Sequence, residues 1–148
     1  MTATIESTDN GVSNYVAATG LLGEGPLTVQ EVGDGNLNFV FRVSRQDDPE
    51  QSLIVKQAPP YIKVLGPDFP LTQRRLAVEA RALELYHTLV PGSVPRPLRF
   101  DAQAHILLME DLRGYRILRD ALVDGDIRPA AAAAVGALMG AMHRATLA

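Results

Sequence analysis

The chain has 148 residues, of which 47% are hydrophobic and 21% charged, and its formal net charge is −3. This length and composition are those of a globular domain that can bury a core of its own. The acidic balance argues against nucleic acid or an anionic membrane as the main partner, because both need a basic surface. The chain has no cysteine, which excludes disulfides, thiolate zinc sites and cysteine nucleophiles and fits a cytoplasmic enzyme.

The amino-terminal residues are polar and lack the basic start and apolar block of a signal peptide. We expect residues 1–13 to be loose and residues 14–22 to form a short helix that ends at Gly23. The longest apolar run, residues 130–142, is shorter than the roughly 20 residues of a membrane span. It therefore predicts a buried helix.

Three strands are predicted next, at residues 28–32, 37–44 and 52–58. The second has a clear period of two between its faces. Short links between the strands favour an antiparallel meander. Residues 59–70 contain four prolines, and we expect them to form a loop.

A helix is predicted over residues 72–90, capped by Thr72, followed by strands at 98–101 and 104–110. The order of three strands, one helix and two strands predicts an α+β fold, with a mainly antiparallel five-stranded sheet and one packed helix. After Asp111 the character changes, and helices are predicted at 117–122 and 129–147.

Lys56 lies inside the apolar run LIVKQA. If Ile54 and Ala58 face the core, Lys56 does too, and a buried ammonium needs an anion. A half-exposed strand from which Lys56 reaches water is an equally good interpretation. Glu79 lies on the apolar face of the 72–90 helix, where alone it would be taken for a rim residue. Two such charges in adjacent elements favour an ion pair between helix and sheet.

Two further segments have weaker signals. The glycine-containing turn at residues 33–38 would let backbone N–H groups approach a phosphate, but a plain hairpin also explains it, and no Rossmann pattern or phosphate loop is present. Residues 109–112 could bind an adenine edge or simply link two domains. The three histidines, which share no metal-ligand spacing and receive no role, are His87, His105 and His143.

Four segments together resemble, in order and spacing, the S-methyl-5-thioribose kinase family, which has a protein-kinase-like fold. They are EVGDGNLNFVFRV, SLIVKQAPPYIKVLGPDFPLT, RRLAVEARAL and LLMEDL. The resemblance covers about residues 28–148, although Phe69 stands where tryptophan is expected. It implies an N-terminal extension (1–27), a nucleotide-binding small lobe (28–110), and a hinge with the start of a helical large lobe (111–148).

The resemblance also implies individual roles. Asn38 would contact ATP, Lys56 would hold its phosphates, and Glu79 would orient Lys56. The other implied residues form the loop over ATP, the back of the pocket and the adenine-binding hinge: Gly33, Gly35, Met109, Glu110, Asp111 and Leu112.

The implied activity is transfer of the γ-phosphate of ATP, with Mg²⁺, to the 1-hydroxyl of methylthioribose in methionine salvage, by a homodimer. Alternatives are a kinase for an aminoglycoside, choline or homoserine, or a non-catalytic nucleotide-binding or interaction module. The sequence contains no H-G-D-like catalytic loop, which phosphoryl transfer in this fold needs. We therefore expect the catalytic residues and metal ligands beyond the chain end, and an isolated chain that has no turnover and binds ATP weakly or not at all.

Overall fold

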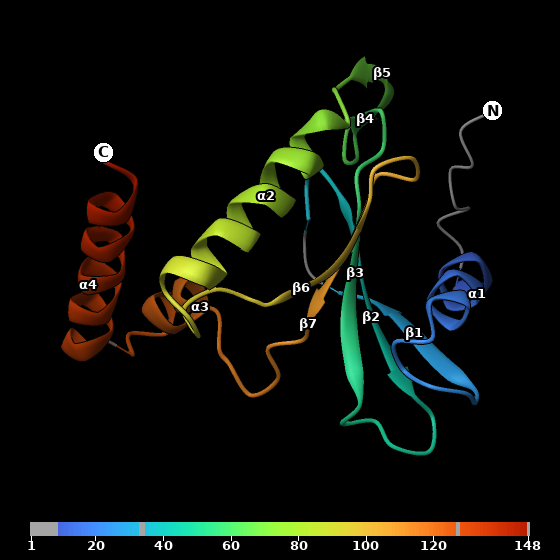
Figure 1. The fold of residues 1–148 in the computed structure, drawn as a ribbon, viewed down its shortest axis with the longest axis horizontal. Coiled ribbons are helices and arrows are strands. Elements are labelled where there is room, and N and C mark those ends of the chain that lie inside the picture. The colour runs from blue at the N-terminus through green and yellow to red at the C-terminus, as the bar shows by residue number, and fades with distance from the viewer. Residues whose placement is uncertain (1–8, 33–34, 127, 148) are drawn as a thin grey trace.

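The computed structural model describes residues 9–32, 35–126 and 128–147 (Figure 1). The predicted α+β architecture is confirmed: five strands form one sheet in the order β1-β2-β3-β7-β6, and every neighbouring pair is antiparallel. The strands are β1 (Leu27–Glu31), β2 (Phe39–Arg45), β3 (Ser52–Gln57), β6 (Pro97–Asp101) and β7 (Ile106–Glu110). The predicted β1-β2-β3 meander is also confirmed.

One face of the sheet is covered by α1 (Asp9–Thr19). Its residues Val12 and Val16, one helical turn apart, pack with Phe41, Val43 and other apolar residues of the sheet. The helix ends at Gly20, whose φ of 69° is the left-handed conformation that commonly stops helices. The predicted helix was placed too late, and the expectation of loose chain is wrong for residues 9–13, because burial of Val12 extends the helix. Residues 1–8 lie outside the described residues.

The opposite face is covered by α2 (Arg74–Leu89). Leu76 and Ala80 pack against Ala58 and Leu107, and all four side chains are buried. The residue directly before this helix, Gln73, makes no side-chain capping bond, but the hydroxyl oxygen of Thr72 accepts a hydrogen bond from the backbone N–H of Arg74 at 3.3 Å, as expected for the predicted cap. The sheet thus has a helix on each face (Figure 1), where the sequence had predicted a single packed helix.

The proline-containing segment after β3 is more regular than predicted. Two short strands, β4 (Tyr61–Ile62) and β5 (Gly66–Pro70), pair antiparallel in a separate two-stranded sheet. Gly66 has a φ of 86°, which favours glycine at this turn. Prolines are tolerated here because each strand has an open edge.

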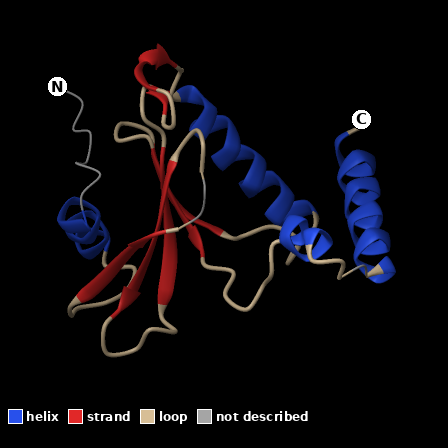
Figure 2. Cartoon of the chain, turned by 180° about the vertical axis from the view of Figure 1, so that it is seen from behind, coloured by secondary structure: helices blue, strands red, loops and turns tan. Residues whose placement is uncertain are grey.

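Two helices follow β7: α3 (Leu118–Val123) and α4 (Pro129–Thr146). Figure 2 shows α4 standing apart from the sheet. The prediction of a buried helix here is wrong, because α4 has no buried residue, and Met139 is 52% exposed. Its alanines are strong helix formers. They explain why the segment is helical, but they do not require it to pack against the sheet. In the described part of the chain, no helix is both long and apolar enough to cross a membrane.

We predict that α1 contributes to the stability of the whole sheet. Val16→Ala removes apolar atoms from a side chain that is fully buried, so the free energy of unfolding should fall by about 2 kcal/mol. Val123→Ala, at an exposed position, should change it by less than about 0.5 kcal/mol. Urea unfolding of both variants measures the difference, and equal effects would contradict the assigned packing of α1.

Candidate functional site

Lys56 and Glu79 form an ion pair between β3 and α2. Lys56 is paired in register with Leu107, which packs on α2, so the lysine lies on the α2 side of the sheet. Its Nζ is 2.6 Å from Oε1 of Glu79, and the two side chains are 22% and 33% exposed. The predicted pairing is therefore confirmed. Partly exposed pairs of this kind contribute less than about 1 kcal/mol, so the pair matters for where it holds the ammonium rather than for stability.

The glycine turn lies above this pair. Gly33 falls outside the described residues, but Gly35 and Asn38 line a hollow of about 360 Å³ together with Lys56 and Glu79. The turn is tight at Gly35, where a Cβ atom would lie 2.9 Å from the carbonyl oxygen of Asn38. The structure thus brings four of the predicted site residues into one hollow.

The β4-β5 hairpin braces the glycine turn from outside. The backbone N–H of Val64 donates to the carbonyl oxygen of Asn36 at 3.2 Å. Lys63 pairs with Glu31 at the end of β1, and its ammonium lies 5.0 Å from the centre of the Phe39 ring. The proline-containing segment after β3 is therefore attached to the turn.

Arg75 is a site residue that sequence reasoning missed. It lines the same hollow, and its Nε donates to Oδ1 of Asn38 at 3.0 Å. Burial lowers the pKa of Arg75 from its ordinary value, and no carboxylate in the described part of the chain pairs with it. Among the described residues that line the hollow, Lys56 and Arg75 face one carboxylate, that of Glu79, so these residues give an excess of positive charge. The sequence did contain a signal for Arg75. It lies at the start of the predicted helix, and a cation at a helix amino terminus is unfavourable unless it has another role.

The same face of the sheet continues from the hollow toward the end of β7. Register pairs Val40 with Lys56, and Arg42 with Ile54. Met109 is in turn paired with Ile54, so it lies on this face. Beyond Met109, the N–H of Glu110 donates to the carbonyl oxygen of Arg96 at 2.9 Å.

Asp111 fastens the segment after β7 to the sheet. Its side chain is 3% exposed and accepts hydrogen bonds from the side chains of Arg42, Ser52 and Arg113, at 2.7, 2.8 and 3.1 Å from their nearest atoms. Burial by itself raises the pKa of Asp111, but the hydrogen bonds from these three side chains lower it below its ordinary value. The sequence had predicted Asp111 only as part of an adenine-binding hinge or a domain link, without these side-chain bonds.

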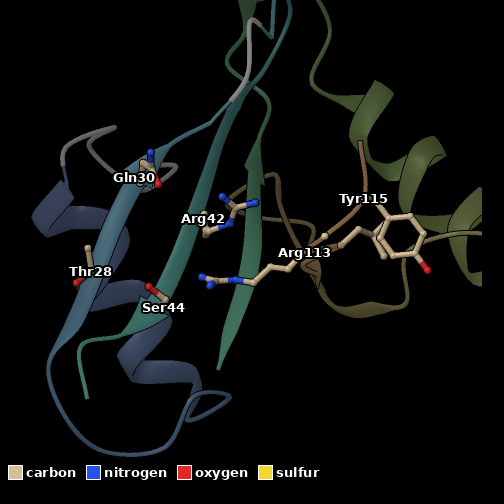
Figure 3. A pocket seen from close by; sticks show the side chains of 8 residues that line it. Thr28, Gln30, Arg42, Ser44, Arg113 and Tyr115 are labelled. Atoms are coloured by element: carbon tan, nitrogen blue, oxygen red, sulfur yellow. The ribbon is translucent and has the colours of Figure 1, made fainter. Parts of the chain in front are cut away.

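A second hollow, of about 330 Å³, lies beside Asp111. Figure 3 shows Arg42 and Arg113 between Gln30 on one side and Tyr115 on the other. Leu112 also lines this hollow. The predicted hinge residues therefore lie at the far end of the sheet face that begins under the glycine turn.

The residues that the structure describes contain no group of three or more His, Cys, Asp or Glu side chains that could hold a metal ion. His87 has a buried Nδ1 without a partner, and His105 has a φ of 52° in a turn. Neither lines the hollow under the glycine turn.

Comparison with known proteins gives consistent relatives. The chain is 42% identical over 123 residues to a methylthioribose kinase of Geobacillus sp. (strain WCH70), covering 82% of this chain and 30% of that protein. It is 42% identical over 111 residues to the methylthioribose kinase of Geobacillus kaustophilus (strain HTA426), covering 74% and 28%. For the methylthioribose kinase of Bacillus cereus (strain B4264) the identity is 43% over 99 residues, covering 67% and 24%. The chain thus spans less than a third of the length of these relatives. No family model matches.

We predict that Gly35→Ala distorts the turn. The added Cβ would meet the Asn38 carbonyl oxygen at 2.9 Å, and backbone cannot yield cheaply, so the free energy of unfolding should fall by about 1–3 kcal/mol. The matched control is Gly136→Ala in α4, where a Cβ meets nothing within 4 Å and a helical alanine is favoured by about 1 kcal/mol. Thermal unfolding of both variants tests this, and a neutral Gly35→Ala would contradict it.

We also predict an acid-sensitive contribution from Asp111. Because its folded-state pKa is lowered, its stabilisation is fully present above the unfolded-state pKa of about 3.9 and is lost as the pH falls through the folded-state pKa. Asp111→Asn should lower the free energy of unfolding at pH 7 by about 1–3 kcal/mol and flatten its acid limb. Urea midpoints from pH 7 to pH 2 measure both effects. Asp68→Asn, at an exposed position, is the control for the loss of one carboxylate, and an acid limb in Asp111→Asn that matches the wild type would refute the assignment.

Proposed function

We propose that this chain, which is homologous over most of its length to part of the methylthioribose kinases, is the nucleotide-binding lobe of an ATP-dependent kinase. The reaction would transfer the γ-phosphate of ATP to the 1-hydroxyl of S-methyl-5-thioribose in methionine salvage. The proposal includes a cytoplasmic location, which the absence of cysteine fits, and a homodimer, which the family resemblance implies.

The observation that carries the proposal is the Lys56–Glu79 pair beneath the glycine turn. Phosphoryl transfer by kinases depends on holding and neutralising the phosphates, with a strand lysine paired to a helix glutamate. Here the Lys56 ammonium would contact phosphate oxygens, and Glu79, 2.6 Å away, would keep it directed into the hollow. The excess positive charge of that hollow supports an anionic ligand.

The nucleotide would extend from this hollow along the sheet face toward residues 110–112. The adenine would lie against Ile54 and Met109, which are register partners. The N–H of Glu110 and the carbonyl of Asp111 are bonded to Arg96 and Arg113, whereas no hydrogen bond engages the Leu112 main chain in the described part of the chain. Leu112 is therefore the hinge residue that we assign to the adenine edge.

The role of this chain is to bind and orient ATP. Mg²⁺ would accompany the nucleotide and neutralise charge on its phosphates. Because the described residues offer no cluster of metal ligands, we assign no Mg²⁺ ligand here.

ATP binding tests the proposal on the chain itself. We expect weak binding of MgATP, followed by amide chemical shifts in an NMR titration, with the largest changes at residues 35–40, 56 and 109–112. Lys56→Met should lower the affinity by at least about tenfold, as expected for loss of a charge-assisted bond. The control is Arg144→Met, which removes an exposed cation from α4, outside the hollow, and equal effects of the two variants would contradict the proposal.

Phosphoryl transfer tests the reaction. The chain can replace the matching segment of the Geobacillus kaustophilus kinase, to which it is 42% identical. The hybrid should phosphorylate methylthioribose, and Lys56→Met in the hybrid should reduce kcat/KM by about a hundredfold or more. A folded, ATP-binding hybrid in which Lys56→Met leaves the rate unchanged would refute the role of Lys56.

A further inference from the structure

Arg75 connects three segments around the glycine turn. Besides Asn38, its guanidinium donates to the carbonyl oxygens of Leu37 and Pro59, at 3.1 and 2.9 Å. It also donates to those of Leu71 and Thr72, at 3.3 and 2.6 Å. All three nitrogens of one side chain therefore bind the turn, the exit from β3 and the entry to α2.

The position of Arg75 is unfavourable for a cation. It lies in the first turn of α2, where the helix dipole repels positive charge. It is partly desolvated, and no described carboxylate compensates it. A carboxylate beside it would neutralise the guanidinium, but would also repel a phosphate in the neighbouring hollow. Because no described carboxylate pairs with Arg75, its positive charge remains available to an anion in the hollow.

The Arg75–Asn38 bond also determines how the Asn38 carboxamide is turned. A guanidinium carries only donors, so the atom of the amide that faces it must be the oxygen. Asn38 is 8% exposed and lines the hollow with Lys56. With Oδ1 held by Arg75, the amide nitrogen Nδ2 is left to donate a hydrogen bond to a ligand.

We propose that Arg75 is a positioning residue for the nucleotide. By holding Oδ1 of Asn38 and the carbonyl of Leu37, it sets the shape of the glycine turn and presents Nδ2 of Asn38, beside Lys56, to an anionic oxygen of the nucleotide phosphates. This inference rests on the proposed function, since it assigns a donor to the same ligand.

Arg75→Lys is the decisive variant. It keeps the charge, but an ammonium cannot reproduce the planar fork that reaches several acceptors at once. Arg74→Lys is the matched control, because Arg74 is the preceding residue of α2 and is exposed. The readouts are the side-chain NH₂ resonances of Asn38 in the free chain, and NMR titrations with MgATP and with inorganic tripolyphosphate.

We expect the Asn38 NH₂ resonances of the wild type to shift on addition of either ligand. In Arg75→Lys they should already differ in the free chain, and the MgATP affinity should fall about tenfold. Arg74→Lys should behave as the wild type. The role of Arg75 would be overturned by an MgATP affinity in Arg75→Lys equal to that of the wild type. It would also be overturned if the wild-type Asn38 NH₂ resonances did not shift when nucleotide binds.

A second variant covers the case in which Arg75→Lys does not fold. Asn38→Asp retains an oxygen for Arg75 but has no N–H₂ group to donate. Its urea midpoint should be equal to or above that of the wild type, while its MgATP affinity should fall about tenfold. Unchanged affinity in Asn38→Asp would also overturn the inference. If instead the wild type responds to neither ligand, both as the isolated chain and in the hybrid kinase, the proposed function fails first, which is a distinct outcome.

Discussion

The Lys56–Glu79 ion pair is the interaction on which the geometry of the site depends. Leu76 and Ala80 supply the apolar contacts that dock α2 on the sheet. The Lys56–Glu79 ion pair is partly exposed to solvent and adds little stability of its own. Its effect is directional: a bond of 2.6 Å from the helix holds the ammonium on the face beneath the glycine turn. The proposed phosphate position follows from that placement, whereas the excess positive charge of the hollow comes from Arg75.

The two ends of this sheet face differ in whether their charged side chains are neutralised by a partner of opposite charge. At one end the Asp111 carboxylate is bound by Arg42, Ser52 and Arg113, which satisfies the charge and fixes the segment after β7. At the other end the partners of the Arg75 guanidinium among the described residues are all neutral oxygens, so none of them cancels its charge. The face is therefore rigid where an adenine would lie and electropositive where phosphates would lie.

Local patterns were enough to predict much of this. The period of two predicted the strand β2, the short links between strands predicted the meander, and the position of Glu79 on the apolar face of α2 predicted its pairing with Lys56. The start of α1, the β4-β5 hairpin and the exposure of α4 were not predicted, because they depend on which surfaces meet after folding. The place of Arg75 at a helix amino terminus is visible in the sequence, but the bonds of Arg75 and Asp111 join segments far apart in the chain, and no local pattern predicts those bonds.

The lysine side chains themselves offer the most direct test of the central claim. The chain has only two lysines, Lys56 and Lys63, so selective ¹³C labelling of lysine gives two Cε signals in an NMR spectrum. On addition of MgATP, the account predicts that the Lys56 signal shifts with increasing nucleotide while that of Lys63 stays nearly fixed. A saturating nucleotide titration that moves backbone amides but leaves the Lys56 signal in place would contradict it.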